Sequence, residues 1–383
     1  MKKATVLVIS LLLFSFYAGA QVRERAVSAG GYTSWLHSAM FDSLGGEWIN
    51  SSMLHNRVNL KAYAGQKITF NLEVRNRFIT GDMVRFDPRY SASLDSDVGW
   101  ADLSWNVINE RSFIFNTTID RAWIDFTAGK LQVRAGRQRI NWSQSLVWNP
   151  NDIFNTYSFF DFDYIERPGS DAVRMIYSTS PSSAAEMAVK INNEGKVTAA
   201  ALYRFNIRNI DLQILAGETD ENTIVGGFGW SGSIGSYSIR GEATWFQPFE
   251  NIGLSDGTVI FTAGIDKSFS ERLMAVSQVM YCNNPLELSD FDELYSGELT
   301  ASQLAFSEFT LMGQLTYTPM PLLNITASAI WYPDLDGFFA GPSIDYSLAE
   351  NVDFSFLWQH FSSIIGGTNT RINLGFIRIK YSF

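Results

Sequence analysis

The sequence predicts an all-β fold, a transmembrane antiparallel β-barrel of about eighteen strands. Two patterns support this prediction: short segments of alternating apolar and polar residues, and connections that alternate between short turns and long loops. A third is the final alternating segment, which ends on an aromatic residue, Phe383. Short periplasmic turns and long outer loops are typical of outer-membrane barrels, whose last strand pairs with the first to leave no open edge.

The amino-terminal segment predicts export. Lys2 and Lys3 precede an apolar stretch from Val6 to Tyr17, and Ala18-Gly19-Ala20 has the small-residue form of a signal-peptidase site. We therefore expect a signal peptide over residues 1–20. The remainder, residues 21–383, is expected to form a single barrel domain in the cell outer membrane of a Gram-negative bacterium.

Composition agrees with many strands and tight turns. Aromatic residues make up 14% of the chain, and 29 glycines accompany only 10 prolines. The net charge of −10 disfavours a nucleic-acid partner. A lone cysteine excludes an internal disulfide.

Alternation along the chain delimits the strands. The final strand should run toward the periplasm, so an upward strand must precede segment 52–63, and 30–41 is the candidate. Sixteen strands is the alternative, if a short pair such as 171–191 is a loop. The predicted strands are 30–41, 52–63, 67–79, 112–128, 130–140, 171–179, 182–191, 197–207, 208–219, 223–233, 236–247, 258–268, 272–282, 309–318, 322–332, 338–348, 351–362 and 371–383.

Strand alternation also assigns faces. Apolar residues such as Leu54 and Val58 should face lipid, which turns the charged residues between them inward. Inward arginines opposite inward acids could create a transverse field that favours anions, or could merely form neutralising pairs between neighbouring strands. The candidate pore-lining and selectivity residues are Arg57, Lys61, Glu73, Arg75, Arg77, Arg121, Asp125, Arg134, Arg174, Arg240, Glu242 and Asp266.

One further arginine set has mixed parity. Arg137 and Arg139 share parity, whereas Arg134 differs. All three could face inward only with a bulge near Gly136.

The connection 141–170 is too long for a simple turn and is rich in aromatic and Asn-Pro residues, which disfavours disorder. We expect it either to fold into the lumen and narrow the pore or to form an outer cap. Its acids have oxygen-ligand character, but their spacing does not match a calcium loop, and salt bridges to Arg167 or Arg174 are favoured over a metal. The constriction candidates are Trp142, Trp148, Asn149, Asp152, Asp161, Asp163, Glu166 and Arg167.

Three stretches, "GRQRINW", "WNPNDIFN" and "ERPGSDAVR", resemble the outer-membrane porin-like group that includes the alginate-export family. The resemblance is strongest over about 115–180, and Ser143 stands where the family often has glycine. It implies a monomeric eighteen-stranded barrel for solute passage, of the Bacteroidota porin type. Alginate itself would need a strongly cationic lumen, which the acidic balance of this chain disfavours.

These observations predict an outer-membrane porin for passive diffusion of a hydrophilic solute, with an anion as the candidate, and no cofactor or bound metal. The alternative is a loop-closed barrel that serves as a surface scaffold or exporter partner. An outer-membrane lipase using His360 with Ser362 or Ser363 is a third reading, disfavoured because no Gly-x-Ser-x-Gly motif is present, so we expect no enzyme. Expected partners are outer-membrane lipid, lipopolysaccharide, the hydrophilic solute and the barrel-assembly machinery, which would recognise Phe383.

Overall fold

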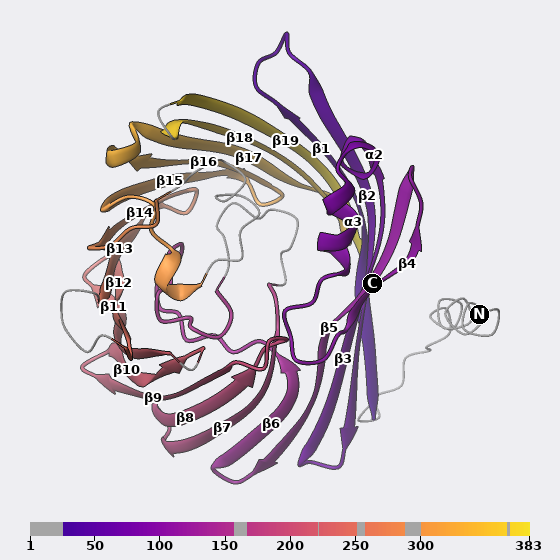
Figure 1. Ribbon diagram of the computed structural model, residues 1–383. Coiled ribbons are helices and arrows are strands. Elements are labelled where there is room, and N and C mark those ends of the chain that lie inside the picture. Colours follow the sequence, from indigo (N-terminus) through magenta and orange to yellow (C-terminus); the bar gives the residue numbers. More distant parts are fainter. Residues whose placement is uncertain (1–25, 157–166, 221, 251–256, 288–299, 366–367) are drawn as a thin grey trace.

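The computed structural model describes residues 26–156, 167–220, 222–250, 257–287, 300–365 and 368–383. The predicted signal peptide lies outside these residues. Eighteen antiparallel strands form a closed wall, seen along its axis in Figure 1. The strands of the wall are β1 (Val27–Phe41), β2 (Trp48–Ala64), β3 (Ile68–Gly81), β5 (Phe113–Ala128), β6 (Leu131–Gln138), β7 (Ser170–Ser180), β8 (Ser183–Ile191), β9 (Val197–Ile207), β10 (Ile210–Thr219), β11 (Thr223–Ile234), β12 (Tyr237–Pro248), β13 (Thr258–Ser270), β14 (Leu273–Cys282), β15 (Phe309–Met320), β16 (Leu323–Tyr332), β17 (Gly337–Ala349), β18 (Val352–Ile365) and β19 (Thr368–Ser382).

The prediction of eighteen strands is confirmed. Segment 171–191, whose loss would have given sixteen, forms the paired strands β7 and β8. Tight turns connect most neighbours, and Gly129 between β5 and β6 has φ 59°, a left-handed conformation that glycine adopts without steric cost.

The seam between the first and last strands closes the wall. β1 pairs antiparallel with both β2 and β19. At the end of the seam, Gly31 and Phe383 exchange two backbone hydrogen bonds, each with N and O 2.9 Å apart. No sheet edge is left open there.

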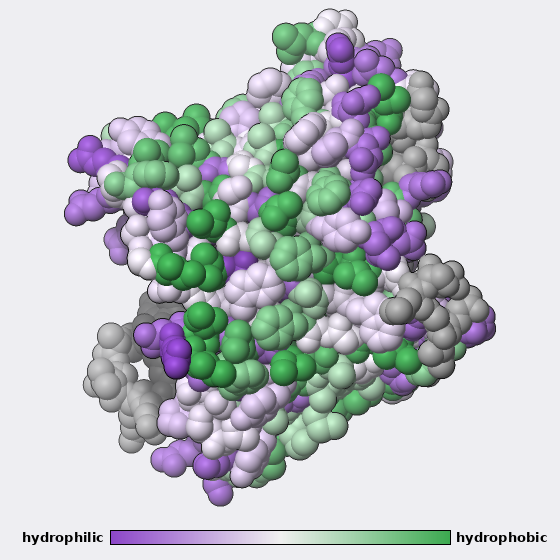
Figure 2. All heavy atoms as spheres, turned by 90° about the vertical axis from the view of Figure 1, so that its left-hand side faces the viewer, coloured by the Kyte–Doolittle hydropathy of each residue, from purple (hydrophilic) through white to green (hydrophobic). Residues whose placement is uncertain are grey.

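The two faces of the wall differ as the alternation predicted. On β2, Leu54 on the outer face is 50% exposed, whereas His55 on the inner face is 3% exposed. Figure 2 shows apolar residues gathered over the middle of the wall around β11 to β15, with hydrophilic residues toward its edges. An apolar outer face around a polar inner face is the outer-membrane type of barrel.

An additional short strand, β4 (Ser104–Asn109), was not predicted and falls within the expected long connection after β3. β5 pairs along one edge with β3, while its other edge is shared by β4 and the shorter β6.

Two short helices, α2 (Asp82–Phe86) and α3 (Pro88–Asp95), precede β4, and Figure 1 shows α3 inside the ring of strands. Leu94 of α3 packs there with Ile79 and Ile114. None of the helices in the described part of the chain is long and apolar enough to cross a membrane.

Candidate functional site: the inner wall and the inserted loop

A group of charged side chains lines the inner face of β2, β3 and β5. Arg57, 1% exposed, forms ion pairs with Glu73 (nitrogen to oxygen 2.5 Å) and with Asp120. Arg75 reaches the other oxygen of Asp120 at 3.3 Å. These three strands lie side by side, so alternation places the charges next to one another.

Two further arginines complete what we call the arginine cluster: Arg57, Arg75, Arg77 and Arg121 with Glu73 and Asp120. Arg77 donates a hydrogen bond to the amide oxygen of Asn116 at 2.8 Å. Arg121 donates to the backbone oxygens of Asp120 and Arg167, each at 2.7 Å. The cluster therefore holds four guanidinium groups against two carboxylates.

A polar cavity of about 290 Å³ adjoins the cluster. Its charged lining residues are Arg75, Arg77, Arg137, Asp97 and Asp120, and Ser93 of α3 and Gly169 also line it. A space of this volume with charged walls has room for several water molecules.

The other predicted pore-lining charges form pairs between neighbouring strands. Arg134 contacts Asp125 at 2.9 Å and stacks over Trp123, with its guanidinium carbon 4.0 Å from the ring centre. Arg240 pairs with Asp266, and Arg174 pairs with Glu186 at 2.6 Å. Lys61 is exposed near the end of β2. In each of these pairs a carboxylate on a neighbouring strand neutralises the arginine, as the second interpretation of the inward charges predicted.

Arg137 and Arg134 bind different partners. The bulge near Gly136 that would let both face inward is not present in the described strands β5 and β6. The β5–β6 pairing continues without a shift through Gly136, which has φ 114°. Arg137 contacts Asp171 at 2.8 Å and Asp97 at 2.5 Å. Its ion pairs therefore connect the segment before β4 to the end of β6 and the start of β7.

Residues 139–155, here the inserted loop, run inside the ring of strands after β6 (Figure 1). Trp142 is 0% exposed and Trp148 is 5% exposed. With Ile140, Val147, Ile153 and Phe154, they form one apolar cluster with inward residues of the strands from β8 to β16, which include Ala188, Leu202, Leu215, Phe246, Ile260, Met280, Met312 and Ile330. The inner face of this part of the wall is therefore covered by the loop rather than by water.

Polar side chains of the wall bind the loop backbone. Glu242, 0% exposed, accepts hydrogen bonds from the backbone nitrogens of Gln144, Ser145 (2.9 Å) and Asn151 (2.8 Å). Glu242 was predicted to line the pore. It lies on the inner face as expected, but the loop covers it, so it anchors the loop instead of facing water.

Other anchors were not predicted. Gln213 donates to the Trp142 carbonyl at 2.6 Å, and Gln278 accepts from the Val147 nitrogen at 3.1 Å. Glu186 accepts from the Trp142 indole nitrogen. Their inward parity in β8, β10 and β14 was the only sequence signal, because their partners are loop atoms far away in the chain.

Asp152 lies at the centre of the inserted loop and is 1% exposed. Burial raises the pKa of its carboxyl from the usual 3.8 to about 8, and the nearby Glu242 adds to the rise, while Arg139 and Lys190 oppose it. Asn149 is also buried and donates to the Val147 carbonyl at 3.2 Å. The candidates Asp161, Asp163 and Glu166 lie outside the described residues. Arg167 has φ 63°.

The residues proposed for a lipase do not form a catalytic pair in the described part of the chain. The His360 Nδ1 atom lies 2.8 Å from the Asn373 amide oxygen. Ser363 is on the opposite face, 2% exposed, and donates to the Leu335 carbonyl.

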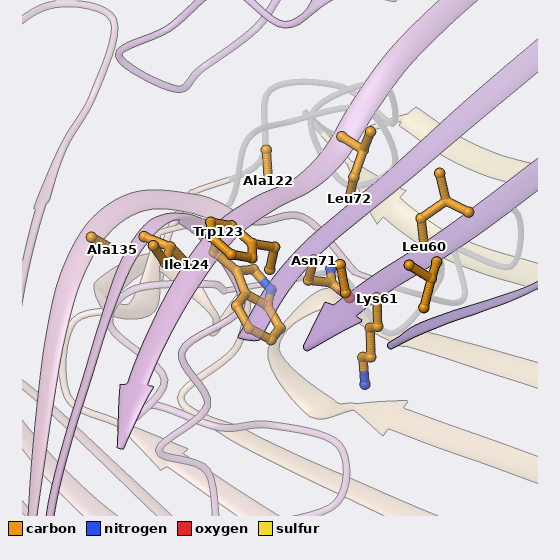
Figure 3. A pocket seen from close by; sticks show the side chains of 11 residues that line it. Leu60, Lys61, Asn71, Leu72, Ala122, Trp123, Ile124 and Ala135 are labelled. Atoms are coloured by element: carbon orange, nitrogen blue, oxygen red, sulfur yellow. The ribbon is translucent and has the colours of Figure 1, made fainter. Parts of the chain in front are cut away.

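An apolar depression of about 450 Å³ lies across β2, β3 and β5. Figure 3 shows Leu60, Leu72 and Ala122 on one side of the sheet and Lys61 and Trp123 on the other. Because its lining is almost entirely apolar, it does not provide a solute site.

No family model and no curated protein matches this sequence. The resemblance to the alginate-export group therefore stays a prediction. Solved structures do match: OccK8 (OprE) of Pseudomonas aeruginosa at 10% identity, over 95% of this chain and 99% of that chain, with a TM-score of 0.61. OccAB3 of Acinetobacter baumannii is 9% identical (93% and 99% covered, TM-score 0.60), and OccAB4 of that species is 8% identical (94% and 99%, 0.59). At these identities the likeness shows the fold, the closed eighteen-stranded barrel.

Proposed function

We propose that this protein is an outer-membrane channel that lets a small or oligomeric hydrophilic anion diffuse across the membrane. The observation that carries the proposal is the division of the inner wall. The inserted loop covers the inner face of the strands from β8 to β16, while the arginine cluster and its polar cavity lie at β2, β3 and β5. A path beside charged side chains suits a hydrated solute and excludes an apolar one.

The anion preference follows from the charge balance. Among the described residues, the cluster brings four arginines together with two carboxylates, and this local composition supports a positive potential although the chain as a whole is acidic. A positive wall in a narrow aqueous path raises the local concentration of anions. Paired charges elsewhere on the inner face, such as Arg240 with Asp266, add little net field.

The test is single-channel conductance of the folded protein in a planar bilayer with a salt gradient. We expect stable steps and a reversal potential of the sign that denotes anion preference. Arg77→Gln keeps a donor for Asn116 but removes one positive charge, so the reversal potential should move toward zero. Lys267→Gln, at a half-buried position near the end of β13, is the matched control and should leave it unchanged. Cation preference in the unaltered protein would refute the anion proposal.

A second candidate, a loop-closed scaffold, is favoured by the extent of packing inside the barrel. Trp142, Phe154 and α3 all occupy interior space, and the cluster arginines are extensively hydrogen-bonded. Verified folded barrels that carry no current would support this candidate over the channel.

A further inference from the structure

A row of polar side chains crosses the outer face of the wall on β1, β2, β3 and β5. Thr33, Asn56, Asn76 and Thr117, here the amide row, lie directly opposite one another on adjacent strands. Each has outer-face parity, because residues two positions away along the same strands include Leu54, 50% exposed, and Phe78, 40% exposed. All four lie within their strands, not at the turns.

This composition is unusual for a face that meets hydrocarbon. Outward positions of β13, by contrast, are Val259, Phe261, Ala263 and Ile265. A carboxamide in contact with acyl chains lacks the hydrogen bonds it would have in water and is costly there. Two amides on adjacent strands therefore call for a polar partner in the membrane.

Hydrogen bonds within the row satisfy only some of the donors and acceptors of the Asn56 and Asn76 side chains. The Asn56 amide nitrogen donates to the Thr33 hydroxyl at 3.0 Å, and the Thr117 hydroxyl donates to the Asn76 amide oxygen at 2.9 Å. In the described structure the Asn56 amide oxygen has no partner but is buried within the row. The Asn76 side chain is only half-buried, and no hydrogen bond from its amide nitrogen is found among the described residues. The Asn76 amide hydrogens are therefore the group of the row left for a partner at the outer face.

We infer that this face binds a second copy of the same chain, related by a two-fold axis parallel to the barrel axis. A two-fold axis brings the same residues of both copies together, and an asparagine side chain offers both donors and an acceptor, so the central pair is self-complementary. Acyl chains offer neither. The next outward positions toward one end of the strands are Gly31, Val58 and Val74, whose small side chains allow two walls to approach.

The inference rests on the membrane location in the proposed function but not on conduction. It differs from the monomer that the family resemblance implies. A dimer that does not conduct would refute the channel and keep this inference, whereas conducting monomers would do the reverse.

Cysteine cross-linking in native outer membranes tests the contact. The single native cysteine, Cys282, is 0% exposed, and C282A gives a cysteine-free background. We expect Asn76→Cys or Asn56→Cys to give a covalent dimer under mild oxidation. Ala263→Cys, at an outward position of β13, is the control and should stay monomeric. No dimer from either asparagine site, or equal dimer from the control, would overturn the inference.

Leucine substitution tests whether the amides hold the dimer. The double variant Asn56→Leu, Asn76→Leu suits lipid better, so the barrel should fold, as heat-modifiable gel migration would verify. Light scattering in mild detergent should give twice the protomer mass for the unaltered protein and one protomer mass for the double variant. A folded double variant that stays dimeric, or an unaltered protein that is monomeric or bound to a different protein, would contradict the proposal.

Discussion

At the scale of single residues, Asp152 shows how burial can make a carboxyl group sensitive to neutral pH. Its pKa is about 8 in the docked loop and near 3.8 when the loop is free. The docked loop therefore holds the proton more tightly, and docking is most stable at low pH and weakens as pH rises from about 4 to about 8.

Channel recordings at several pH values check this dependence. We expect larger or more frequent conductance fluctuations at about pH 8 than at about pH 5, because the loop undocks more often. Asp152→Asn mimics the protonated group and should weaken the trend. A trend of equal size in this variant would assign the pH dependence to another group.

The sequence predicted which face of the wall a side chain lies on, but it did not predict what covers that side chain. Alternation placed Glu242 and Asp266 on the inner face because strand side chains alternate strictly. It could not show that the inserted loop covers Glu242, since the loop is 91 to 98 residues away along the chain. The roles of Gln213 and Gln278 were not predicted for the same reason.

At the scale of elements, the inserted loop depends on Glu242. Glu242→Ala leaves three backbone N–H groups without an acceptor, and each buried unpaired donor costs about 1–3 kcal/mol. We expect residues 144–151 to detach, with larger single-channel conductance and faster cleavage by added protease.

The matched control for this prediction is Asp353→Ala. Asp353 is an inner-face carboxylate that pairs only loosely with Lys380, at 3.7 Å, and its side chain is 47% exposed. Exposed pairs contribute little to stability. Unchanged conductance in Glu242→Ala, or an equal change in the control, would show that the carboxylate does not hold the loop.

Element boundaries were predictable where side chains contrast. β2 and β3 were clear because leucine, valine and phenylalanine alternate with arginine, glutamate and asparagine. β1 needed the parity argument, because its glycines, serines and alanines blur the pattern. β4 is six residues long within a loop-like stretch, so its pairing with β5 was not visible.

At the scale of the whole molecule, closure of the barrel depends on Gly31. A methyl group at this position would meet the Arg57 carbonyl oxygen at 2.1 Å, next to the hydrogen bonds with Phe383. Gly31→Ala should therefore lower stability by about 1–3 kcal/mol, the usual cost of overpacking.

Urea unfolding followed by gel migration would measure the effect. Gly313→Ala on β15 is the control, because no atom lies within 4 Å of the added methyl group. Equal midpoints for the two variants would show that the seam tolerates the added volume.

The seam has a consequence for the order of assembly. Each strand of the wall pairs with its successor, except that β19 must find β1 from the far end of the described chain. Loop closure over such a separation carries an entropy cost and slows folding. Until it happens, the growing sheet has two free edges that can pair with other chains. The most aggregation-prone intermediate should therefore be the nearly complete, still open sheet.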